Sequence, residues 1–298
     1  MSLSVKNITK AFGSNIAVDN LSMHMETPGV FGLIGTNGAG KTTTIRCILG
    51  IMSADNGSAE WNGNKISRET LSFGYMPEER GIYMKTKVLE QLVYFGMLRG
   101  MNKTDAKSSA LSYMDKLGVT EYSDIPAEKL SKGNQQKIQL ISTLIHNPVL
   151  IFLDEPFSGL DPVNAVILND LIDELVDRKR FIVMSSHQMN TVEQYCKDIL
   201  ILHKGKTVLQ GNLTKIKSGY GHTNLVVSRS DEIQSIAQQT GMQLIAKRAE
   251  ELEYKINGME MAGAFLKKMV ESDIHPTKFL VKEPSLNEIF IEKVGEEA

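Results

Sequence analysis

One segment has the residue types and spacing of a phosphate-binding loop. Residues 35–42 read Gly-Thr-Asn-Gly-Ala-Gly-Lys-Thr and fit the pattern G-x-x-x-x-G-K-[ST]. Glycines let backbone N–H groups curve around phosphate oxygens, and the start of a helix adds a partial positive charge. We predict that Lys41 reaches the β- and γ-phosphates and that the Thr42 hydroxyl binds Mg²⁺. The nucleotide-binding residues expected here are Gly35, Thr36, Asn37, Gly38, Ala39, Gly40, Lys41, Thr42 and Thr43.

Two adjacent carboxylates follow an apolar run later in the chain. Asp154 and Glu155 end the sequence Ile-Phe-Leu-Asp-Glu-Pro, which is typical of a buried strand. Such a pair is often only a solvated strand end, but the phosphate loop favours a catalytic interpretation. We expect Asp154 to hold Mg²⁺ through water and Glu155 to act as general base towards the attacking water.

Kinases and GTPases share these two features, so the class of nucleotide hydrolase needs further residues. A GTPase would carry an Asn-Lys-x-Asp base reader, but Asn64 and Lys65 are followed by Ile66 and Ser67. Residues 130–136 read Leu-Ser-Lys-Gly-Asn-Gln-Gln and lie shortly before the carboxylates. This segment resembles the LSGGQ signature of ABC ATPases, with Lys132 and Asn134 in place of a Gly and the Gln. The resemblance covers residues 1 to about 211.

The resemblance implies further site residues and the cofactors ATP and Mg²⁺. Phe12 matches the aromatic residue that stacks on adenine, and His187 matches the switch histidine at the γ-phosphate. Glu78 lies where most members have a glutamine, and a carboxylate there can still ligate Mg²⁺. Lys41, Glu155 and His187 are thus the expected catalytic residues, and Thr42, Asp154 and Glu78 are the expected metal ligands.

The same family pattern predicts a composite site. Ser131 and Gly133 are expected to cap ATP bound to a second copy, or to a homologous ATPase subunit. Asp161, in Ser-Gly-Leu-Asp at residues 158–161, resembles the loop that crosses this dimer interface. Taken alone, that segment is equally consistent with a capped turn before a helix that begins at Pro162.

The elements that must position these residues can be read from hydrophobic periodicity. Apolar runs near residues 29–34, 149–153, 181–184 and 199–202 alternate with helical stretches, which indicates a parallel α/β sheet. Residues 3–8 and 15–25 predict paired strands, and residues 84–137 predict a helical subdomain, with Thr104 as the N-cap of a helix over 104–117. The expected fold is an α/β P-loop ABC ATPase core with antiparallel β and helical subdomains, assigned to residues 1–218.

Residues 219–298 are predicted to form a small C-terminal α+β domain. Strands expected near residues 224–228, 243–247, 252–256 and 277–282 alternate with helices in an order compatible with a ferredoxin-like unit. No clustered His, Cys or carboxylate site is evident there. Packing or dimer stabilisation is therefore the favoured role, and ligand sensing is the alternative.

Composition excludes several classes of protein. The 298 residues hold 33 Lys+Arg and 35 Asp+Glu, a net charge of -2, so no nucleic-acid partner is expected. Cys47 and Cys196 lie in apolar segments, which favours buried thiols over a disulfide or zinc site. The apolar runs are shorter than the ~20 residues that cross a bilayer.

We therefore expect a cytoplasmic protein that lies on the inner face of the membrane through an integral membrane permease. Residues 77–83 and 283–290 are similar to ATP-binding subunits of ABC-2-type exporters for sodium extrusion and drug resistance, which favours export. The alternative is a soluble ABC ATPase acting on ribosomes or nucleic acid, but one cassette and a short helical insertion argue against it.

Overall fold

The structure, a computed structural model, describes residues 1–67, 71–79 and 81–296. The chain divides into two compact units, Met1–Gln210 and Gly211–Ala298. The predicted boundary, between residues 218 and 219, would cut α7 (Leu213–Tyr220), which lies wholly in the second unit. Residues 212–222 have the composition of a linker, but the Asn212 side chain accepts a hydrogen bond from the Lys215 N–H at 3.2 Å and caps this helix.

A sheet whose strands β9, β3, β8, β7 and β6 pair in parallel forms the centre of the first unit, with the strand order β10-β9-β3-β8-β7-β6. Its strands are β3 (Gly29–Gly35), β6 (Phe73–Met76), β7 (Leu150–Asp154), β8 (Phe181–Ser186), β9 (Asp198–His203) and β10 (Lys206–Asn212). The predicted parallel strands are confirmed, whereas β6 and β10 were not expected from the sequence. Helix α6 (Met189–Tyr195) follows β8.

An antiparallel sheet covers one side of this unit, with the order β2-β1-β4-β5. Its strands are β1 (Leu3–Phe12), β2 (Asn15–Met25), β4 (Asn56–Trp61) and β5 (Asn64–Lys65). Helix α1 (Lys41–Ile48) packs between the two sheets, and its Ile45 and Ile48 belong to a core that contains residues of both. The helix that follows the phosphate loop is therefore held on both sides by buried apolar contacts.

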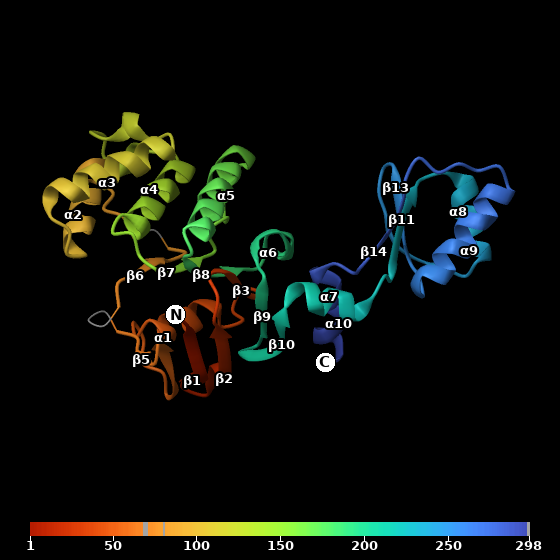
Figure 1. Cartoon of the computed structure of the whole chain (residues 1–298), viewed down its shortest axis with the longest axis horizontal. Coiled ribbons are helices and arrows are strands. Elements are labelled where there is room, and N and C mark those ends of the chain that lie inside the picture. Colours follow the sequence, from red (N-terminus) through yellow and green to blue (C-terminus); the bar gives the residue numbers. More distant parts are fainter. Residues whose placement is uncertain (68–70, 80, 297–298) are drawn as a thin grey trace. The chain divides into compact units, whose positions relative to one another are not determined.

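A helical subdomain gathers at the other end of the unit, away from β1 and β2 (Figure 1). It contains α2 (Val88–Leu98), α3 (Lys103–Lys116), two short 3₁₀ turns (Thr120–Tyr122 and Ala127–Lys129) and α4 (Lys132–Leu144), with α5 (Pro162–Asp177) beyond β7. The predicted N-cap Thr104 is wrong, because Asn102 accepts the bond from the Asp105 N–H at 2.9 Å. An amide oxygen caps as well as a hydroxyl, and α3 begins earlier as a result.

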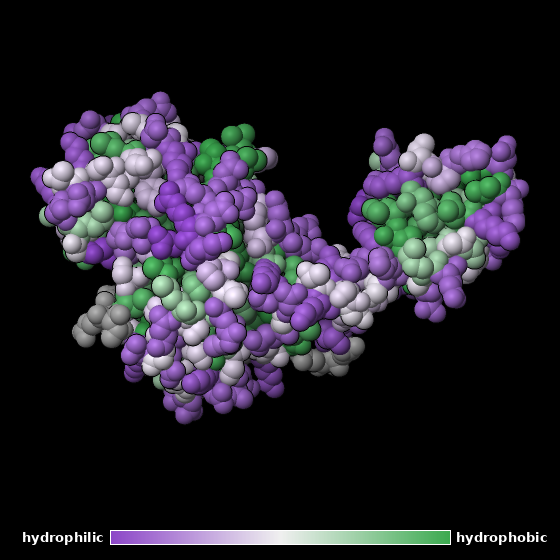
Figure 2. Space-filling model, viewed as in Figure 1, coloured by the Kyte–Doolittle hydropathy of each residue, from purple (hydrophilic) through white to green (hydrophobic). Residues whose placement is uncertain are grey.

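The second unit contains the predicted ferredoxin-like arrangement. Its antiparallel sheet has the order β12-β13-β11-β14, with helices in the connections. The elements are β11 (Asn224–Ser228), α8 (Asp231–Gln239), β12 (Gln243–Lys247), β13 (Glu251–Lys255), α9 (Gly258–Glu271), β14 (Phe279–Lys282) and α10 (Leu286–Glu296). Apolar residues of α8 and α9 pack on one face of this sheet and form a separate core. In the view of Figure 2, hydrophilic residues cover much of the surface of this unit, with hydrophobic residues among them.

Candidate nucleotide-binding site

The predicted catalytic residues follow three neighbouring strands of the parallel sheet. The phosphate loop follows β3, Glu155 follows β7, and His187 follows β8, which lies between them. In this register Leu33 and Asp154 both pair with Ser185. The carboxyl ends of parallel strands meet at one edge, so the topology brings together groups that are far apart in the sequence.

Glycines are required in the phosphate loop for two structural reasons. Gly40 has φ 108° and precedes α1, and a Cβ atom there would lie 2.3 Å from the Ala17 carbonyl oxygen. Gly38 has φ 80°, in the left-handed region that favours glycine. The loop lines a pocket of about 380 Å³, a volume in the range of small-molecule sites. The residues lining this pocket are Ala17, Asn37, Gly38, Ala39, Gly40, Lys41, Thr42, Thr43 and Glu78.

A buried ion pair joins the phosphate loop to the proposed general base. Lys41 Nζ lies 3.1 Å from Glu155 Oε1, and the two side chains are 7% and 5% exposed. The same ammonium donates to the Gly35 carbonyl at 2.8 Å and to the Thr36 carbonyl at 3.3 Å. The other oxygen of Glu155, Oε2, lies 2.8 Å from His187 Nδ1. Lys41, Glu155 and His187 thus form one contiguous polar cluster.

The backbone of Glu155 adopts a strained, left-handed conformation. Its φ is 52°, which is uncommon for a residue other than glycine. Its N–H donates to the Ser185 hydroxyl at 3.0 Å. The Ser185 hydroxyl in turn donates to Asp154 Oδ1 at 2.5 Å. Ser185 therefore orients the Asp154 carboxylate and holds the backbone of Glu155, a role that no motif predicted because a serine at a strand end is common.

Asp154 has the environment of a metal ligand. Burial raises the pKa of this carboxyl group above its usual value, while the hydrogen bond from Ser185 and the nearby Thr42 hydroxyl act in the opposite direction. Its Oδ2 atom is buried and has no hydrogen-bond partner among the described residues. A buried carboxylate oxygen without a partner, beside a threonine hydroxyl, suits a hard cation such as Mg²⁺. The residues present therefore fit the expected metal.

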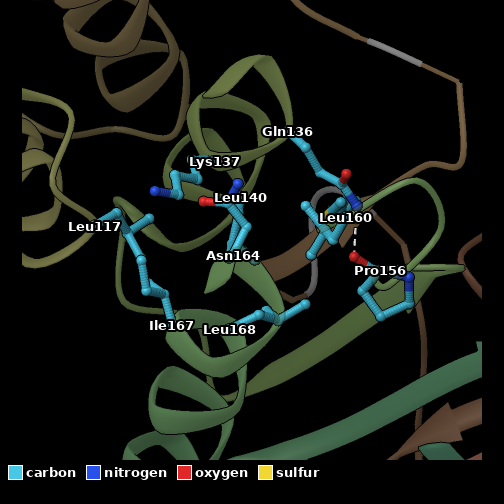
Figure 3. A pocket seen from close by; sticks show the side chains of 10 residues that line it. Leu117, Gln136, Lys137, Leu140, Pro156, Leu160, Asn164, Ile167 and Leu168 are labelled. Atoms are coloured by element: carbon cyan, nitrogen blue, oxygen red, sulfur yellow. Dashed lines mark hydrogen bonds between the residues drawn. The ribbon is translucent and has the colours of Figure 1, made fainter. Parts of the chain in front are cut away.

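Helix α4 holds the loops that carry the acidic residues. The Gln139 amide donates to the Pro77 carbonyl at 2.7 Å and to the Glu79 carbonyl at 3.1 Å, so it fixes the backbone on either side of Glu78. One turn earlier, the Gln136 amide donates to the carbonyl of Pro156, which directly follows Glu155 (Figure 3). Neither glutamine was predicted, because a contact between a side chain and a distant backbone leaves no pattern in a single sequence.

The remaining predicted residues lie at the surface of this unit. The hydroxyl of Ser131 accepts from the Asn134 N–H at 3.2 Å and caps α4, and Asp161 caps α5 through the Asn164 N–H at 2.9 Å. Phe12 ends β1 and is 49% exposed. Phe12, Ser131, Gly133 and Asp161 are not among the described residues that line the phosphate-loop pocket. Their predicted contacts with nucleotide remain predictions.

Comparisons with known proteins agree with this geometry. The sequence matches the ABC transporter family over residues 18–158 and the DrrA1-3-like ATP-binding protein C-terminal domain over residues 211–294. It is 41% identical over 294 residues to the ABC transporter ATP-binding protein YhaQ of Bacillus subtilis, covering 98% of each chain. It is also 30% identical over 308 residues to the linearmycin resistance ATP-binding protein LnrL of the same organism, again covering 98% of each.

Solved structures show the same fold. The structure of an ATP-binding subunit of an ABC transporter superposes with a TM-score of 0.68 at 27% identity, covering 74% of this chain and 94% of that one. An ATP-binding cassette in its ADP conformation gives a TM-score of 0.64 at 24% identity, covering 73% and 94%. The phosphate loop, the two carboxylates and these relatives lead to one conclusion. The chain belongs to the ATP-binding proteins of ABC transporters, of the ABC-2 and DrrA-like type.

Proposed function

We propose that this chain is the ATP-hydrolysing subunit of an ABC exporter and drives a separate membrane permease through ATP-dependent dimerisation. The observation that carries the proposal is the cluster of Lys41, Glu155 and His187 beside the phosphate loop. Such a cluster can bind a triphosphate and activate water at the same edge of the sheet.

Glu155 suits the role of general base. Its carboxylate contacts Lys41 of the phosphate loop and lies within hydrogen-bond reach of His187, and Ser185 holds its backbone N–H. Lys41 contacts this carboxylate, so a phosphate group that binds the loop competes with Glu155 for the ammonium. We infer that nucleotide binding releases Glu155 to face the attacking water, with His187 as its remaining neighbour.

Mg²⁺ would be held by Asp154, Thr42 and Glu78, and its charge would offset that of the phosphates. The Asp154 carboxylate is already oriented by Ser185, while Glu78 lines the pocket and is exposed. Glu78 is thus the ligand most easily moved. Its position depends on Gln139, which fixes the adjacent backbone.

The positions of the signature residues support the proposed dimer. Ser131 and Asp161 are exposed, and each begins a helix whose first N–H groups point outward. A helix N-terminus attracts phosphate, which supports Ser131 and Gly133 as the groups that cap ATP on a second copy. Val163 on the first turn of α5 is 71% exposed, which is consistent with an interface beside Asp161.

A groove beside the Glu78 loop offers a place for the permease. It has a volume of about 790 Å³ and lies between β6 and the helices α2 and α4. Among its lining residues are Pro77 and Gln139, which also fix the Glu78 loop, and Leu98, which is 63% exposed. A permease segment bound in this groove would be displaced when that loop moves, which would couple hydrolysis to transport. The same contact would hold this chain at the inner face of the membrane.

Export is favoured by the relatives, because one of them is named for linearmycin resistance and the C-terminal domain matches the DrrA type. No helix of the described residues is long and apolar enough to span a bilayer.

The experiment is Mg²⁺-dependent ATPase activity of the purified chain over a range of protein concentrations. Composite sites predict a rate that rises more steeply than linearly with concentration, and no activity in Lys41→Ala. A linear rise would contradict the dimer. Association of the native protein with ribosomes in place of membranes would instead support a soluble ABC ATPase.

A further inference from the structure

Helix α9 of the C-terminal unit is apolar on two faces, although only one of them packs on the sheet. Its inward face carries Ala262, Phe265 and Met269, which belong to the core of this unit. A second stripe contains Met259, Leu266 and Val270, which are 60%, 37% and 56% exposed. A stripe of this kind on a surface helix indicates a missing partner.

The neighbouring helix α8 has no such exposed apolar stripe. Helix α8 covers the same face of the sheet, and its exposed positions are the polar residues Asp231, Glu232, Ser235, Gln238 and Gln239. Of the two helices that cover this face of the sheet, only α9 therefore has an exposed apolar stripe.

The spacing of the stripe identifies the kind of partner. Met259, Gly263, Leu266 and Val270 are separated by four, three and four residues, the repeat by which two helices pack along a common seam. A Cβ atom at Gly263 would meet no atom within 4 Å, so another helix can approach closely there. The spacing is the same when the helix is read in the opposite direction. An antiparallel copy of α9 would thus place Met259 against Val270 and Gly263 against Leu266.

The charges beside the stripe match the same pairing. Glu260 and Lys267 are exposed and each follows a stripe residue, so both lie on the flank that faces solvent. In an antiparallel pair this flank faces the equivalent flank of the second helix, and Glu260 of each copy meets Lys267 of the other. Lys267 Nζ lies 3.8 Å from Glu271 of its own helix, and its side chain is 78% exposed. Exchanging this weak ion pair for one with Glu260 of the second copy therefore costs little free energy.

We propose that α9 is a self-association surface, through which the C-terminal units of two copies of this chain pair antiparallel. The interface is two-fold symmetric, as a homodimer requires. Two helices of this length bury less than the ~1,200 Å² of a standard stable interface, so the pairing alone is weak, with a Kd of about tens of micromolar. It raises the effective concentration of one ATPase unit near the other. It needs no nucleotide, so it can be tested apart from the proposed ATP-dependent dimer.

The test is sedimentation of the nucleotide-free, full-length chain at protein concentrations up to roughly 200 µM, well above the expected Kd. The wild type should form dimers, and Leu266→Glu should abolish them. Ala264→Glu adds the same charge to the solvent-facing side of the same helix and should leave dimerisation unchanged. Unaltered circular dichroism would show that each variant folds.

Charge reversal tests the orientation. Glu260→Lys and Lys267→Glu should each weaken the dimer by about fivefold, because two attractive pairs become repulsive. The double variant should restore it, and an equimolar mixture of the two single variants should form heterodimers. A wild-type chain that stays monomeric, a Leu266→Glu chain that still dimerises, or a double variant no better than the single ones would overturn the proposal.

Discussion

Glu155→Gln separates the catalytic role of Glu155 from its structural role. The amide has nearly the same shape, so the contacts to Ser185 and to the backbone should persist. Lys41 keeps its bonds to two carbonyl oxygens, so no buried cation is left without a partner. The fold should therefore survive, and the loss should be confined to chemistry and charge.

The size of each effect follows from the geometry. Loss of a general base typically lowers turnover by about 10²–10⁴-fold. At 3.1 Å, the attraction between Lys41 and Glu155 is about 5 kcal/mol if the effective dielectric constant is about 20. ATP must replace this attraction when it binds. In the variant, ATP no longer has to displace the charged Glu155 from Lys41. If this lowers the cost of binding by about 1.4 kcal/mol, ATP should bind about tenfold more tightly.

The assay combines Mg²⁺-dependent turnover with equilibrium binding of ATP. Glu155→Gln should lose turnover, bind ATP more tightly than the wild type, and accumulate as a nucleotide-bound dimer. Glu128→Gln is a suitable control, because Glu128 is exposed in the helical subdomain. Turnover at the wild-type rate, or weaker binding of ATP, would refute the assignment of Glu155 as a base restrained by Lys41.

Three further outcomes are expected. Gln139→Leu leaves two backbone carbonyls beside Glu78 without their donor, so the free energy of unfolding should fall by about 1–3 kcal/mol and the Mg²⁺ concentration for half-maximal ATPase should rise. Burial and the nearby Arg99 lower the pKa of His146 to about 4, so the unfolded chain binds its proton first as the pH falls. The contribution of His146 to stability should thus decline by about 3 kcal/mol between pH 6.5 and pH 4, measured as the difference in urea unfolding between the wild type and His146→Gln. Burial raises the pKa of Cys196 to about 12, so a thiol reagent at pH 8 should modify it only after unfolding.

Much of the site could be predicted because its residues are specified by local spacing. The phosphate loop needs glycines at fixed offsets, and Glu155 follows an apolar strand that topology places beside it. The C-terminal order of elements was also predictable, because each strand and helix there has a clear period and is followed by a turn.

The rest depends on contacts between distant segments. Ser185 joins the Asp154 carboxylate to the Glu155 backbone and Gln139 fixes the Glu78 loop, yet neither residue type is distinctive by itself. Strand β6 was not expected because it is short and contains Gly74, where a Cβ atom would lie 2.7 Å from the Thr143 carbonyl oxygen. A glycine required for close packing weakens the strand signal in the sequence.

A mixture of two inactive variants tests the composite site most directly. Lys41→Ala disables the phosphate loop. Ser131→Asp keeps the cap of α4, since aspartate caps as well as serine, but it repels the γ-phosphate of the opposite copy. Ser131→Asn is the neutral control. Each variant alone should be inactive, and their mixture should regain ATPase activity, because one of the two sites in the heterodimer then has an intact loop and an intact signature. A mixture as inactive as its components would contradict the account.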